Sequence, residues 1–507
     1  MIKAISSVVI FTLIAKLLGF IRELMLSFFF GTTGVSDAYL ISQTIPGTIF
    51  QFVGTGLTTC FIPIYYKILR KEGRSAGNAF TNQIITIVLL FSTVVITLVW
   101  AITPVFVKIF AAGFQGQTLA YAIVFTRIGI CSLYFSTLIY VYNSFLQANS
   151  IFGPTAFAAI PNSLVIIVSI ILGSLWNLWA LSVGSTFAPV AQLIVLWPVV
   201  HKLGFRLRLN FYWKDSYLKL FFKMMVPVIL GVSINEINTL IDRSVASQVS
   251  VGGISALTYA NSLIMLIQGG FAQPVATVFY PNISKEVEKK NVTKAKELLQ
   301  DATEVLFIGL IPITIGFIMY AQPITKVLFG RGAFDEQAIG MTSTAVAFYA
   351  IGIVFVGLRE LLSRYYYSYA DTKTPMKNAM IGMAVNIILN LTLSRLIGIG
   401  GLALATSVSA LITTSIMWVE CRTKTAGGKL HLNVHEFLKI VVASIVMGGG
   451  SFIVYQRLDS PDLIRLIVSV AVGGVIYLLL LLVLRVEMAI RIVKSIQRYW
   501  RFLRKAL

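Results

Sequence analysis

The chain is poor in the residues on which soluble proteins and enzymes depend. Only 12% of its 507 residues are charged, against about 25% in an ordinary soluble domain. Its three cysteines, Cys60, Cys131 and Cys421, lack metal-ligand spacing, which argues against a disulfide scaffold or a zinc site. It has three histidines and neither a phosphate-binding loop nor a nucleophile motif. We therefore expect no soluble fold, no enzymatic activity and no cofactor.

Long apolar runs dominate what is present. Hydrophobic residues make up 57% of the chain, and a bilayer core about 30 Å thick needs about 20 apolar residues per helix. Runs such as 85–102 lack the strict alternation of barrel strands, so an all-α polytopic membrane protein is predicted. Its 14 transmembrane helices are expected near 5–30, 38–65, 83–106, 118–146, 155–174, 178–200, 221–246, 254–282, 303–325, 341–369, 378–396, 401–420, 438–457 and 464–485.

Basic residues outnumber acidic ones by 41 to 20, for a net charge of +21. With a cytoplasmic N-terminus, 29 of them fall in predicted inner segments, six in outer loops and six inside helices. This asymmetry follows the positive-inside rule and places both termini in the cytoplasm, so nucleic acid is not needed to explain the charge. The basic tail, 486–507, is predicted either as an amphipathic helix on anionic phospholipid or as a solvated tail.

An internal repeat organises the helices. The motif F-x-P-x-x-x-K begins at Phe61 and again at Phe279, and Pro104 recurs as Pro323 at nearly the same spacing. Copies six helices apart enter the membrane in the same direction, which predicts a parallel repeat with a site between two six-helix lobes. The predicted parts are an N-terminal lobe (1–202), a basic linker (203–220), a C-terminal lobe (221–420), two extra helices (438–485) and the tail.

Charged side chains inside predicted helices are the candidate binding residues. Each costs at least about 2.5–3.5 kcal/mol at the bilayer centre, so such residues usually face a cavity or pathway. Arginine and lysine directed at a cleft would bind an anion, and arginine suits phosphate. Snorkelling or structural ion pairing remains the alternative for each residue. The candidates are Lys16, Arg22, Glu23, Asp37, Arg127 and Arg243.

A second group of polar residues could couple transport to an ion. Asn386 and Asn390 lie one helical turn apart, Thr406 lies on the next predicted helix, and Glu236 lies on the seventh. Their oxygens could hold a monovalent cation, although intramembrane asparagine also forms interhelical hydrogen bonds. Coupling to a cation or to the membrane potential is therefore the only cofactor-like requirement that we expect.

Several motifs resemble those of the MurJ (MviN) lipid II flippases, which belong to the multidrug/oligosaccharidyl-lipid/polysaccharide (MOP) exporter superfamily. The resemblance covers nearly the whole chain, including its length with fourteen helices. The motifs that carry it are KLLGFIRE (16–23), FGTTGVSDAY (30–39), FIP (61–63), YA (259–260) and YADTKTP (369–375).

The resemblance implies two six-helix lobes around a central cationic cavity and a groove for the polyprenyl tail at 438–485. It assigns Arg22, Glu23 and Asp37 to functional positions, and Lys16 stands where the family usually has arginine. Two usual arginines are absent, because the chain reads GTIFQ at 47–51 and YANS at 259–262. Arg243 and Arg127 are the candidates to compensate for them.

The predicted function is a flippase in the bacterial cytoplasmic membrane that moves lipid II, an undecaprenyl-pyrophosphate-linked peptidoglycan precursor, to the outer leaflet by alternating access. We expect it to act as a monomer near cell-wall synthesis enzymes. Alternatives are a flippase for another polyprenyl-pyrophosphate-linked glycan, of exopolysaccharide or teichuronic type, and a multidrug exporter. A glycan polymerase would need a large outer loop with catalytic residues, and the predicted outer loops are short.

Overall fold

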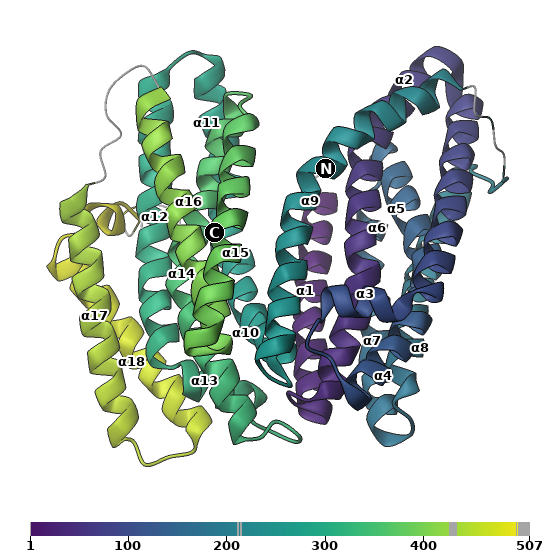
Figure 1. Ribbon diagram of the computed structural model, residues 1–507. Coiled ribbons are helices and arrows are strands. Elements are labelled where there is room, and N and C mark those ends of the chain that lie inside the picture. Colours follow the sequence, from purple (N-terminus) through teal and green to yellow (C-terminus); the bar gives the residue numbers. More distant parts are fainter. Residues whose placement is uncertain (1, 210–211, 213–214, 425–432, 493, 495–507) are drawn as a thin grey trace. The chain divides into compact units, whose positions relative to one another are not determined.

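The regular secondary structure of the described residues, 2–209, 212, 215–424, 433–492 and 494, is entirely helical (Figure 1). The computed structural model divides into two compact units, Met1–Ser255 with Arg331–Asp335, and Ala256–Gly330 with Glu336–Leu507. The helices of the first unit are α1 (Ile2–Phe30), α2 (Gly34–Ala101), α3 (Thr103–Phe110), α4 (Gly116–Gly129), α5 (Ser132–Ala148), α6 (Gly153–Phe157), α7 (Ala159–Leu175), α8 (Trp179–Lys202) and α9 (Ser216–Val249).

The second unit contains the rest of the helices, apart from the first residues of α10, which belong to the first unit. They are α10 (Gly253–Ile267), the π-helical turn η1 (Gln268–Ala272), α11 (Gln273–Glu288), α12 (Val292–Met319), α13 (Ala321–Phe329), α14 (Glu336–Ser368), α15 (Lys373–Ile397), α16 (Ile399–Lys424), α17 (Val434–Arg457) and α18 (Asp462–Val483). Residues 493 and 495–507 of the predicted tail lie outside the described part of the chain.

Helix α2 contains two predicted membrane segments. Its 68 residues would extend about 100 Å if straight, three times the thickness of a bilayer core. Gly73, with φ 81°, breaks the helix. The rings of Phe61 and Phe80 lie 5.7 Å apart, so the two halves fold back on each other. Helix α2 therefore contains the segment predicted at 38–65 and most of the one predicted at 83–106, whose last residues belong to α3.

The polytopic character predicted from composition is confirmed. Among the described residues, eleven helices are long and apolar enough to cross a membrane, or twelve if α4 and α5, bent by 45°, form one span. This count treats α2 as one helix and omits α1, which carries Lys16, Arg22 and Glu23. The total of fourteen spans therefore stays a prediction.

The internal repeat is visible in unusual backbone conformations. Left-handed residues occur in pairs at nearly the same spacing as the repeated sequence motifs, and the pairs are Gly31 and Gly252, Gly73 and Lys290, and Ser150 and Ala370. Residues other than glycine rarely adopt positive φ, so the recurrence of the same turns at one spacing supports duplication. The short helices α3 and α13 are also equivalent in order.

Contacts divide the chain differently from the repeat. Helix α9, the first of the predicted C-terminal lobe, packs on α2 and α3 and belongs to the first compact unit. The predicted lobe boundaries rest on the repeat, which is a separate criterion, and they stay a prediction.

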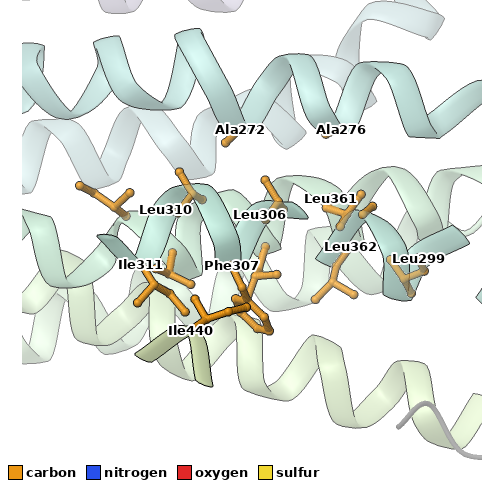
Figure 2. Packing of buried hydrophobic residues seen from close by; sticks show 14 of the residues in the cluster. Ala272, Ala276, Leu299, Leu306, Phe307, Leu310, Ile311, Leu361, Leu362 and Ile440 are labelled. Carbon is orange, nitrogen blue, oxygen red and sulfur yellow. The ribbon is translucent and has the colours of Figure 1, made fainter. Parts of the chain in front are cut away.

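Each unit has its own apolar core. In the first unit the core lies between α2, α5, α8 and α9 and includes Phe61, Tyr65 and Phe145. In the second, Figure 2 shows leucines of α12 and α14 packed beneath Ala272 and Ala276 of η1 and α11. The small alanines let these helices approach closely, as is typical of helix packing in membranes.

Helix α18 is joined to other helices of the second unit by polar contacts, beside the apolar core to which α17 and α18 both contribute. The Tyr477 hydroxyl donates to the Ile308 carbonyl at 2.8 Å, which joins α18 to α12. Lys326 of α13 forms an ion pair with Asp462 of α18 at 2.9 Å. The hydrogen bond and the charge of Asp462 raise the pKa of Lys326.

Candidate functional site

The charged residues of α1 differ in their surroundings. Lys16 is exposed. Arg22 and Glu23 form an ion pair, with Nη2 and Oε1 2.9 Å apart, in which the arginine side chain is 38% exposed and the glutamate side chain 11%. The arginine side chain is therefore partly exposed, whereas the glutamate side chain is buried inside the unit.

Polar side chains of α2 and α8 lie in the same region of the first unit. Tyr39 is buried and lies close enough to Arg22 and Glu23 for both charges to interact electrostatically with its hydroxyl group. The Gln43 side-chain amide donates to the Ser185 hydroxyl at 2.8 Å, and Ser185 also lies close to Tyr39. Sequence reasoning misses these neutral residues, because polar residues of this kind are common in membrane helices.

Asp37 holds the beginning of α10. Its buried carboxylate accepts hydrogen bonds from the Gly252 amide, the Ser255 amide and the Ser255 hydroxyl, each at 2.8 Å. A carboxylate suits the N-terminus of a helix, where amide groups lack partners and the dipole is positive. The structure thus gives Asp37 a capping role, and its predicted contact with substrate stays a prediction.

The region around Asp37 is built from equivalent parts of the two repeats. The Gly113 amide donates to the Ser247 hydroxyl at 3.0 Å, and the Ala333 amide donates to the Phe28 carbonyl at 2.8 Å. Gly113 and Gly332 are equivalent in the repeat, and both are packed so closely that a Cβ would lie 2.1 or 2.2 Å from a carbonyl oxygen. The repeated motif reveals these glycines, but not their contact partners.

Glu236 and Arg243 share a face of α9, as their spacing predicts. Both are half-buried, Glu236 lies close to Thr48 of α2, and the charge of Arg243 acts on Glu236. The structure therefore brings together two predicted residues, one basic and one acidic, in the first unit.

Arg127 has a structural environment. Its guanidinium lies 5.0 Å from the centre of the Trp100 ring, and its Nε donates to the Thr103 hydroxyl at 3.4 Å. Cation–π contact of this kind contributes about 0.5–2 kcal/mol. These contacts connect α4 to the end of α2 and to α3, and they favour a packing role over compensation for the absent arginines.

The three predicted ion ligands of the second unit are joined by hydrogen bonds. The Asn390 side-chain Nδ2 donates to the Asn386 side-chain Oδ1 at 2.8 Å, and the Asn386 Nδ2 donates to the Thr406 hydroxyl at 3.3 Å. Both asparagines are buried. These bonds match the alternative to an ion site, in which intramembrane asparagines form hydrogen bonds between helices. They also bring several side-chain oxygens together. Glu236 belongs to the other unit.

An apolar groove of about 590 Å³ runs along the second unit. Its described lining comes from α12, α14, α16 and α17 and includes Ile311, Val354, Leu358 and Val441. The predicted tail groove at 438–485 overlaps it at α17, whereas α18 contributes none of the described lining residues. Helices of the predicted C-terminal lobe form most of the wall.

The YADTKTP motif forms a helix start. Asp371 accepts hydrogen bonds from the Thr374 amide at 3.0 Å and from the Thr374 hydroxyl at 2.6 Å, at the beginning of α15. Ala370 just before it has φ 56°. Within the described residues no cluster of His, Cys, Asp or Glu is arranged to hold a metal ion.

Comparison with known proteins identifies the family. The model of the family described as Lipid II flippase MurJ matches residues 26–459. Probable lipid II flippases MurJ of Thermotoga maritima and Rickettsia prowazekii are 29% and 26% identical, covering 94% and 86% of this chain and 95% and 86% of their own.

Solved structures show the same fold. A structure titled Lipid II flippase MurJ, inward closed conformation, has a TM-score of 0.82 at 24% identity and covers 93% of this chain and 97% of that one. An inward-facing multidrug resistance MATE transporter of the MOP superfamily has a TM-score of 0.67 at 13% identity, covering 81% and 94%. The predicted MOP exporter fold is thereby confirmed, and the chain belongs to the MurJ lipid II flippase family.

Proposed function

We propose that this protein moves lipid II from the inner to the outer leaflet of a bacterial cytoplasmic membrane by alternating access. The observation that carries the proposal is the partly exposed arginine Arg22 on a helix of a MurJ-family chain. Arginine binds phosphate oxygens in bidentate geometry, so Arg22 would bind the pyrophosphate. Lys16, exposed on the same helix, would add a second positive charge.

The apolar groove of the second unit would hold the polyprenyl tail. Its lining is almost entirely hydrocarbon and aromatic, with Thr314, Thr414 and Ser415 as its hydroxyl residues. Hydrocarbon placed there stays in an apolar environment while the charged headgroup crosses. The protein would thus need to provide a polar path only for the headgroup.

Because the headgroup is charged, the membrane potential is a suitable driving force for its movement. Crossing the membrane changes the energy of one charge by about 2.3 kcal/mol per 100 mV of potential. The oxygens of Asn386, Asn390 and Thr406, with Glu236, are our candidates for a coupled monovalent cation. Flipping by the purified protein in vesicles of controlled potential, with sodium, potassium or choline as the only added cation, would test both. Equal rates in all conditions would reject both forms of coupling.

We further propose that both termini lie in the cytoplasm, that the protein acts as a monomer close to cell-wall synthesis enzymes, and that the basic tail binds anionic phospholipid. The distribution of lysine and arginine supports the orientation. Fusing a reporter that is active only in the cytoplasm to each terminus would test it.

Complementation tests the function itself. The chain is expressed in a bacterium depleted of its own lipid II flippase, and lipid-linked precursors of the inner leaflet are measured. We expect the wild type to restore growth and prevent lipid II accumulation, and Arg22→Ala to do neither at equal expression. Arg127→Ala is the matched control, because its contacts are structural. Accumulation of a different polyprenyl-linked glycan on loss of the native protein would assign it that cargo instead.

A further inference from the structure

We propose that Glu23 is an internal competitor for Arg22, occupying the guanidinium in the empty site and being displaced by the substrate diphosphate. Glu23 would thereby set the affinity so that cargo is released after translocation. The inference rests on the proposed function, because it takes Arg22 as the residue that binds phosphate.

The contact between the two side chains requires a particular side-chain conformation. Consecutive residues on a helix point about 100° apart and do not normally face each other. For Nη2 of Arg22 to reach Oε1 of Glu23 at 2.9 Å, the long arginine side chain must turn around the helix. The ion pair therefore fixes the position of the guanidinium.

The two partners differ in their freedom to leave. Glu23 is buried, with its side chain 11% exposed, whereas the Arg22 side chain is 38% exposed. A guanidinium has five N–H donors, and in the described part of the chain the bond to Glu23 is the only hydrogen bond that the Arg22 side chain makes. The arginine is therefore held by a single bond and can turn toward an incoming diphosphate, while the buried glutamate stays in place.

Separation of the pair is costly for Glu23. Its second oxygen, Oε2, is buried and has no hydrogen-bond partner among the described residues. Loss of Arg22 would leave both carboxylate oxygens without a hydrogen-bond partner among the described residues, because Oε1 accepts only from Arg22. An unpaired buried charge is strongly unfavourable, so this cost is subtracted from the binding of any anion that draws Arg22 away.

Such competition suits a transporter. A site must bind its cargo well enough to capture it and weakly enough to let it go. A carboxylate within reach gives the guanidinium a second partner at the moment of release. A purely structural role for Glu23 makes the opposite prediction, because disturbing the helix would weaken binding.

The test compares binding of two probes, purified lipid II and farnesyl diphosphate, to the full chain in detergent. Glu23→Gln keeps the size of the side chain but removes its charge. We expect its Kd for both probes to fall about tenfold or more, because the charged bond between Glu23 and Arg22 no longer competes with binding of the diphosphate. Its flipping rate in vesicles should fall, because release is slower. Glu23→Asp, which keeps the charge, should stay close to the wild type.

Glu360→Gln is the matched control, because Glu360 also pairs with an arginine, Arg364, at 3.0 Å in the second unit. It should leave both Kd values unchanged. An unchanged or higher Kd for Glu23→Gln in a folded protein would overturn the inference, as would equal tightening in the control. If Glu23→Gln does not fold, the Kd of Glu23→Asp becomes the deciding measurement. Weaker binding of the probes by Glu23→Asp than by the wild type would then overturn the inference. Failure of the wild type to bind lipid II while the Glu23 effect persists with farnesyl diphosphate would refute only the proposed cargo.

Discussion

The buried carboxylate of Asp37 offers the sharpest test of how the first unit is held together. Asp37 is 1% exposed and accepts three hydrogen bonds from Gly252 and Ser255, all at 2.8 Å. In Asp37→Asn, the side-chain oxygen can still accept from Ser255, but the side-chain nitrogen then faces the Gly252 N–H, which loses its acceptor. The variant has nearly the same volume as the wild type, so packing is preserved.

The magnitude follows from the bonds that are lost. A hydrogen bond to a charged group contributes about 1.5–3 kcal/mol, and a buried donor left unsatisfied costs about 1–3 kcal/mol. Loss of one oxygen acceptor and of the charge should therefore destabilise the first unit by about 2–4 kcal/mol. For a unit of this size the expected fall in Tm is roughly 5–10 °C.

Thermal unfolding of the purified protein in detergent, followed by tryptophan fluorescence, measures the change. The matched control is Asp371→Asn, which removes a similar carboxylate from the beginning of α15 in the second unit. Because Asp371 is only half-buried, its effect should be smaller, about 1 kcal/mol as for an ordinary helix cap. A Tm of Asp37→Asn equal to that of the wild type would refute the assignment of Asp37 to the cap of α10.

Three further outcomes are expected. Gly113→Ala should lower stability by about 1–3 kcal/mol by overpacking, since its Cβ would meet the Ser247 carbonyl, whereas Gly340→Ala, with open space, should not; equal Tm values for both would contradict the packing. Val419→Trp, at an exposed position of the groove wall, should fill the apolar groove and reduce flipping of lipid II in vesicles at normal stability. Leu478→Trp on the exposed face of α18 should have no effect, and full activity of both variants would exclude the groove as the tail site. Trp100→Ala should cost about 0.5–2 kcal/mol through loss of the cation–π contact while growth in complementation is retained, and loss of growth at normal expression would assign that contact a transport role.

Some features of the site are predictable because they depend on residue type and spacing. The charge of α1 follows directly from Lys16, Arg22 and Glu23. The common face of Glu236 and Arg243 follows from their helical spacing of two turns. The proximity of Asn386 to Asn390 follows from a single turn, and the position of Thr406 on the adjacent helix follows from the order of the apolar runs.

Other features depend on contacts between distant segments. The sequence predicts Asp37 as a substrate contact, but its neighbours Gly252 and Ser255 come from the other repeat, far along the chain. The packing of Arg127 on Trp100 likewise depends on how α4 meets the end of α2. One sequence without its fold contains no information on which of these segments touch.

The sequence by itself determined that the protein is a polytopic helical membrane protein with a duplicated plan, because apolar length, charge placement and repeat spacing are properties of the linear chain. Only the tertiary structure decided what each intramembrane charge does. Burial and the nearest hydrogen-bond partners separate a partly exposed arginine such as Arg22 from a carboxylate whose oxygens are already occupied, such as Asp37. Those two properties are set by the packing of helices from distant parts of the chain.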